Sequence, residues 1–168
     1  MDAKDFKALF NDVALAHGFQ TAYGGWYREL PVGLFVVSLQ KSNFGNYFEA
    51  NLKLFLNQTA SAGSWDLKKC VKSMSGDIFR RQPEEYRRAF DLDLPLESSE
   101  RRAAIGRMFD ELIDHVVRVA TGSSGLLRLR DEGVFFILPA VEKRLSADLL
   151  PVSCRKGRTS GRSVGPDE

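Results

Sequence analysis

Four arginines gather between residues 80 and 88: Arg80, Arg81, Arg87 and Arg88. Arginine binds phosphate oxygens, and the neighbouring Tyr86 could stack on a base, which is the chemistry of a nucleic-acid site. Acidic residues are interleaved with these arginines, namely Glu84, Glu85, Asp91 and Asp93. The stretch is therefore nearly neutral. We interpret it as solvated strand surface with charged cross-strand pairs, and nucleic-acid binding stays an alternative.

A second polar group lies within a strongly helical stretch: Asp110, Glu111, Asp114 and His115. Their spacing puts carboxylates and an imidazole on adjacent turns, as in the metal sites of helical bundles. On a helical wheel Asp110 and Asp114 lie opposite the apolar stripe, and His115 lies at its edge. A metal would need further ligands, and His17 is the only other histidine of the chain. We predict no metal site.

The sequence carries no recognisable catalytic or cofactor motif. It has no G-x-S-x-G, no Walker loop, no paired cysteines and no H-E-x-x-H. Gly24-Gly25 fits a hairpin turn better than a phosphate cradle, because no helix begins after it. We predict no catalytic residue and no cofactor, and an enzyme with a dispersed site stays an alternative.

The net charge is concentrated at the C-terminal end. Residues 151–168 hold four basic side chains and two acidic ones, which accounts for the whole net charge of +2 and leaves residues 1–150 neutral. The strongly basic folded domain that is usual in duplex-binding proteins is absent. Glycine, serine, arginine and proline dominate from Ser153 onward. We therefore predict a disordered basic tail over 151–168 and a single domain over 1–150.

Cysteine usage and hydropathy indicate the compartment. The two cysteines, Cys70 and Cys154, cannot form a disulfide framework, which favours a reducing environment. Met1 to Lys7 do not resemble a secretory signal, and no apolar run approaches the roughly 20 residues of a membrane span. We predict a soluble, cytoplasmic protein without a membrane partner.

Alternating hydrophobicity over 34–40 and 47–56 predicts the central element, an antiparallel hairpin joined by the turn-forming residues 41–46. One face carries residues such as Phe35, Val37, Leu52 and Leu54, and we expect it to form the core. Each large apolar side chain contributes about 1.5 to 3 kcal/mol on full burial. This hairpin is the segment around which the other elements must pack.

Shorter patterns predict the remaining elements. Spacings of three and four indicate a first helix from Asp2 or Asp5 to Gly18, a short helix capped by Ser64, a long helix over 98–120 and a short helix over 123–133. Extended segments are predicted over 19–23, 26–30, 78–79 and 86–92, while 134–138 fits either a buried strand or the run into a helix beginning at Pro139. The fold class is α+β: an N-terminal helix, an antiparallel meander of four to six strands, and a long C-terminal helix packed on the sheet.

The second face of the hairpin is also partly apolar, since Leu34, Val36, Tyr47 and Phe55 lie on it. Such a face is either covered, for example by a C-terminal helix, or used for binding. Our candidate binding residues lie at this face and at the adjoining loop: Lys41, Ser42, Tyr47, Asn51, Lys53 and Phe55.

Several segments resemble one protein family. In their order along the chain they are Gly18-Phe19, Trp26-Tyr27-Arg28, Leu39-Gln40-Lys41-Ser42 and Phe48-Glu49-Ala50-Asn51-Leu52. Together they resemble the bacterial family named domain of unknown function 4304, over residues 6–56. The resemblance implies an α+β domain of bacterial origin with no known activity, and it assigns no catalytic residue.

Taken together, these patterns favour a small non-catalytic binding or protein-interaction module. Its partner would be another protein or a small ligand, bound at the outer surface of the hairpin. The nucleic-acid alternative uses the segment 80–88 and the basic tail.

Overall fold

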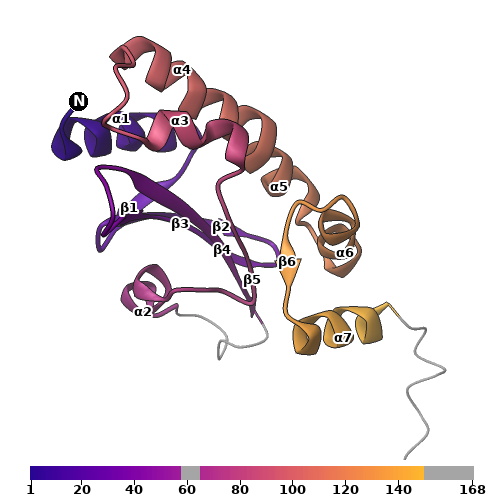
Figure 1. Ribbon diagram of the computed structural model, residues 1–168. Coiled ribbons are helices and arrows are strands. Elements are labelled where there is room, and N and C mark those ends of the chain that lie inside the picture. The colour runs from indigo at the N-terminus through magenta and orange to yellow at the C-terminus, as the bar shows by residue number, and fades with distance from the viewer. Residues whose placement is uncertain (58–64, 150–168) are drawn as a thin grey trace, which may run out of the picture.

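The computed structural model describes residues 1–57 and 65–149 (Figure 1). The predictions of a disordered tail over 151–168 and of a helix cap at Ser64 lie outside these residues. Within the described part of the chain, no helix is both long and apolar enough to span a bilayer.

The described residues form one six-stranded antiparallel sheet in which spatial order follows chain order. Its strands are β1 (Gln20–Ala22), β2 (Gly25–Leu30), β3 (Gly33–Lys41), β4 (Phe48–Leu56), β5 (Ile78–Arg81) and β6 (Phe136–Ile137). The α+β prediction and the meander are confirmed. The segment 134–138 contains the two-residue strand β6, in which Ile137 is buried and Phe136 is exposed, so the expected buried strand is present only in part. The alternative is also realised, because α7 (Pro139–Asp148) begins directly after this segment, with proline in its first turn.

The hairpin of β3 and β4 is the centre of the sheet, as its alternation predicts. Phe35 lies opposite Leu54 and Val37 opposite Leu52, and all four side chains are buried in the main core. The helix α1 (Ala3–Ala16) covers this face, with Asp2 accepting hydrogen bonds at 2.8 Å from the backbone N–H groups of the first turn.

The predicted long helix exists but is not uniform. It consists of α4 (Ser98–Met108), a π-helical segment (Phe109–Ile113) and α5 (Asp114–Val119). Figure 1 shows α1, α3 (Arg87–Phe90) and α4 together on one side of the sheet, with α5 leading on to α6 (Ser123–Asp131). The apolar side of this long helix closes the main core.

The prediction of a strand over 86–92 is wrong. This segment forms a 3₁₀ turn (Glu84–Tyr86) and then α3 (Arg87–Phe90). Within the two helical elements Tyr86, Ala89 and Phe90 are buried, and Ala89 and Phe90 follow Tyr86 by three and four positions, which is the spacing of one face of a helix. The fully buried Arg101 favours this helix over a strand, since its guanidinium donates to the carbonyls of Ala89 and Asp91 at 2.6 and 2.8 Å.

The other face of the sheet has a covering of its own. The helix α2 (Leu67–Lys72) lies there, on the side opposite α1 and α4 (Figure 1). Its Cys70 and Val71 pack against Leu34 and Val36 in a second, smaller apolar cluster. The second apolar face of the hairpin is therefore partly covered, by α2 rather than by a C-terminal helix.

Candidate functional site

The six predicted binding residues divide into two groups in the structure. Lys41, Ser42 and Tyr47 line one hollow, and Asn51 lies beside it, donating to the Gln40 side chain at 3.2 Å. Lys53 and Phe55 lie further along β4, where α2 covers the sheet. The sequence placed all six on one surface because strand parity cannot show where a covering helix ends.

The expectation that Lys53 is exposed is wrong, since its side chain is only 1% exposed. Its ammonium donates to the backbone carbonyls of Cys70, Val71 and Ser73 at 3.2, 2.9 and 2.9 Å. Carbonyls at the end of a helix have no partner within the helix, so Lys53 supplies one for α2. Burial lowers the pKa of Lys53 to about 8.

Phe55 likewise belongs to the structural group. It is half-buried and packs against the second apolar cluster together with Tyr27 and Trp65. Neither Lys53 nor Phe55 can therefore contribute to an open binding surface.

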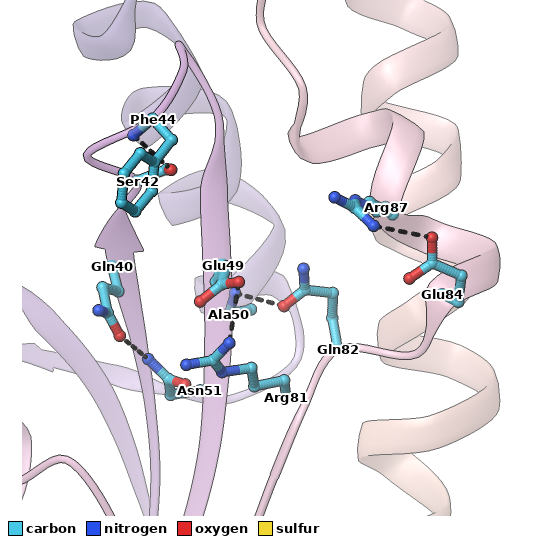
Figure 2. A network of polar contacts seen from close by, with 10 residues as sticks. All are labelled: Gln40, Ser42, Phe44, Glu49, Ala50, Asn51, Arg81, Gln82, Glu84 and Arg87. Atoms are coloured by element: carbon cyan, nitrogen blue, oxygen red, sulfur yellow. Dashed lines mark hydrogen bonds and ion pairs between the residues drawn. The ribbon is translucent and has the colours of Figure 1, made fainter.

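The first group lines a hollow of about 260 Å³. It lies where the end of β3, the loop that follows, the start of β4 and the end of β5 meet (Figure 2). We call this hollow and its loop the β3–β4 corner; its lining residues are Gln40, Lys41, Ser42, Asn43, Phe44, Tyr47, Glu49 and Arg81.

Hydrogen bonds fix the shape of the loop at this corner. The Ser42 N–H donates to the carbonyl of Tyr47 at 2.9 Å, and the Phe44 N–H donates to the Ser42 hydroxyl at 3.0 Å. The ring of Phe44 is nevertheless 97% exposed. This aromatic side chain, at the rim of the hollow, is therefore accessible to another molecule.

Charged groups surround the hollow. Arg81 pairs with Glu49 at 3.0 Å, and the Arg87 guanidinium lies 5.9 Å from the centre of the Tyr47 ring. Among the described residues, Lys41 is exposed and makes no ion pair, which leaves its ammonium available to an incoming group.

The edge of β4 at this corner is closed to a further strand. The Ala50 N–H donates to the Gln82 side chain at 2.6 Å, and the Gln82 N–H donates to the Ala50 carbonyl at 2.9 Å (Figure 2). At Ala50, β4 therefore has no free backbone N–H or carbonyl with which to extend the sheet by a further strand.

The arginines of the nucleic-acid alternative are mostly engaged with the protein. Arg80 donates to the Val134 carbonyl at 2.7 Å, and burial lowers its pKa. Arg81 pairs with Glu49, and Arg87 pairs with Glu84 at 3.2 Å. Arg88 is exposed and, within the described residues, forms no ion pair. The four side chains thus do not present one common surface of available charge.

The polar residues of the long helix separate in the structure. His115 pairs with Glu132 at 2.8 Å. Glu111 accepts a 2.5 Å hydrogen bond from the Tyr86 hydroxyl; burial, followed by this hydrogen bond, raises the pKa of Tyr86 to about 12. Asp110 and Asp114 instead face His17, at the end of α1. No sequence pattern could have found this grouping, because His17 precedes Asp110 by more than 90 residues.

The described part of the chain has two further hollows. One, of about 330 Å³, lies between α1 and the β1–β2 turn, and the other, of about 240 Å³, lies between the β2–β3 turn and the helices α6 and α7. Neither is lined by an exposed aromatic side chain, so the β3–β4 corner is the stronger candidate for partner binding.

No protein-family model, curated protein or solved structure matches this chain. The resemblance over residues 6–56 to the domain of unknown function 4304 family therefore stays a prediction.

Proposed function

We propose that this protein is a non-catalytic, cytoplasmic protein-interaction module whose contact surface is the β3–β4 corner. The observation that carries the proposal is the ring of Phe44, 97% exposed at the rim of a hollow that also contains Tyr47. Aromatic side chains are enriched among residues that dominate binding energy at protein interfaces.

The chemistry of the hollow indicates the kind of partner. Phe44 and the half-buried Tyr47 offer apolar surface, and Lys41 offers a positive charge at the same rim. Glu49 and Arg81 neutralise each other at 3.0 Å. A protein segment with an apolar side chain next to an acidic one would complement this arrangement, because the apolar group can cover Phe44 while the carboxylate pairs with Lys41.

Binding, not catalysis, fits the lining groups. The titratable side chains of the hollow are those of Lys41, Tyr47, Glu49 and Arg81. Ser42 also lines the hollow, but its hydroxyl accepts from the Phe44 N–H and, among the described residues, makes no hydrogen bond to a side-chain base of the kind that activates a nucleophile.

Photo-crosslinking tests the proposal directly. Benzoylphenylalanine replaces Phe44 in the full chain, expressed in its native cells, and the crosslinked species is identified by mass spectrometry. Affinity for the identified partner, purified, is then measured by titration calorimetry. We expect Phe44→Ala to weaken binding at least tenfold, and Lys41→Glu to weaken it and reduce its salt dependence.

Met74→Ala is the matched control, since Met74 is a 70% exposed apolar side chain away from the corner. It should bind like the wild type, and Phe44→Ala should unfold at the same denaturant concentration as the wild type. Crosslinking to nucleic acid, or equal weakening by Met74→Ala and Phe44→Ala, would overturn the proposal.

A further inference from the structure

Three metal-ligating side chains from distant parts of the chain converge beside the π-helical segment. They are His17, which ends α1, Asp110 within the π-helical segment, and Asp114, the first residue of α5. One donor atom from each lies within 4.8 Å of the other two. This cluster is separate from the β3–β4 corner and plays no part in the proposed interaction.

The imidazole of His17 is held in a fixed orientation. Its Nδ1 lies 3.0 Å from a carboxylate oxygen of Asp114, its ring packs on Phe109 with centroids 5.0 Å apart, and its side chain is 17% exposed. A carboxylate at Nδ1 favours the tautomer that carries the proton there. The lone pair of Nε2 then points away from Asp114.

The Asp110 carboxylate lies on the Nε2 side of the ring, at a distance that suits a shared ion better than a hydrogen bond. Nε2 and the Asp110 oxygen are 3.8 Å apart, which is too long for a hydrogen bond. Two ligand atoms bound to one zinc ion at about 2.0–2.2 Å lie roughly 3.4 Å apart at a tetrahedral angle. The Asp110 side chain is 68% exposed, so a small rotation can close the remaining gap and solvent can reach the site.

We infer that His17 and Asp110 bind a divalent transition-metal ion of the zinc class, with Asp114 orienting the imidazole. The arrangement of carboxylate, histidine and metal is one that protein metal sites use repeatedly. One imidazole nitrogen and one carboxylate favour zinc and its neighbours over calcium or magnesium, which prefer oxygen ligands throughout. Water completes the coordination, and the two carboxylates outweigh the nearby Arg28, which donates to the His17 carbonyl at 2.8 Å.

Bound metal would join α1 to the junction of α4 and α5. His17 caps the N-terminal helix and Asp110 belongs to the long helix, so an ion shared between them would add a link to those made by core packing, the His17–Asp114 contact and the Arg102–Asp12 ion pair. A ligand that binds only the folded state raises stability, so zinc should raise the melting temperature of the protein.

Titration calorimetry with Zn²⁺ on the full chain tests this inference. All proteins carry Cys154→Ser, which removes the thiol of the C-terminal segment as a competing ligand. We expect one equivalent of zinc to bind and to raise the melting temperature. Asp110→Asn and His17→Ala should each weaken binding more than tenfold and abolish the thermal shift.

His115→Ala is the control, because His115 is the other histidine of the chain, on the same long helix, and pairs with Glu132. It should bind zinc like its parent. Asp110→Asn keeps the test decisive even if His17→Ala disturbs folding, since Asp110 is largely exposed. Absence of zinc binding, unchanged binding in Asp110→Asn, or loss of binding in His115→Ala would each overturn the inference.

Discussion

The ammonium of Lys53 donates to the carbonyl of Val71 at 2.9 Å, which ties the central strand β4 to the end of α2. This contact divides the outer face of the sheet in two. On one side of it, α2 covers the apolar residues; on the other, the β3–β4 corner stays open to a partner.

Removing the Lys53 ammonium should detach α2. In Lys53→Met, the carbonyls of Cys70, Val71 and Ser73 lose their common donor. We expect the free energy of unfolding to fall by about 3 kcal/mol, because hydrogen bonds from a charged group contribute about 1.5–3 kcal/mol and buried carbonyls would be left unpaired. Urea denaturation measures the loss. Lys68→Met, at an exposed position on the same helix, should change little, and equal effects would refute this role.

Because of the same lysine, the free energy of unfolding should depend on pH in the alkaline range. Its pKa is lowered from 10.5 to about 8 in the folded protein, so between these values the unfolded chain binds more protons. The free energy of unfolding contributed by this group therefore rises with pH across that window, by at most about 3 kcal/mol. The measurement is the difference in the free energy of unfolding between the wild type and Lys53→Met, determined by urea denaturation at pH 7.5 and at pH 10. A difference that does not move with pH would contradict the lowered pKa.

Arg101 should be essential for the fold of the segment that follows β5. It is fully buried and donates to the carbonyls of Ala89, Asp91 and Leu94, which fix the end of α3 and the chain after it. We expect Arg101→Met to lower the free energy of unfolding by about 3–4 kcal/mol, as for removal of a buried charged partner.

The adjacent Arg102 provides the control for that measurement. Its side chain is half-exposed and pairs with Asp12 at 3.0 Å, and exposed pairs of this kind contribute less than about 1 kcal/mol. Chemical denaturation of Arg102→Met should therefore resemble that of the wild type. If both variants lose the same stability, the buried hydrogen bonds of Arg101 are not the cause.

The elements that the sequence predicts correctly are those specified by their own side-chain period. The alternation over β4 puts Leu52 and Leu54 in the core, and the three-four spacing with Asp2 as cap defines α1. Both patterns are local, because a strand or helix must turn its apolar side chains to one face whatever covers that face.

Tertiary contacts decided the rest. Tyr86 to Phe90 fits two periods, and the buried Arg101, more than ten residues away, selects the helix. Strand parity predicts Lys53 on the outer face, and it cannot predict that α2 covers this face and buries the side chain.

The sequence by itself thus determined the first four strands with their central hairpin, and the first and long helices. Only the tertiary structure brought His17 to Asp110 and left Phe44 in solvent at the rim of a hollow. The physical reason is one of range: periodicity reports which face of an element is apolar, whereas a site depends on which distant side chains the packing of those faces brings within a few ångströms.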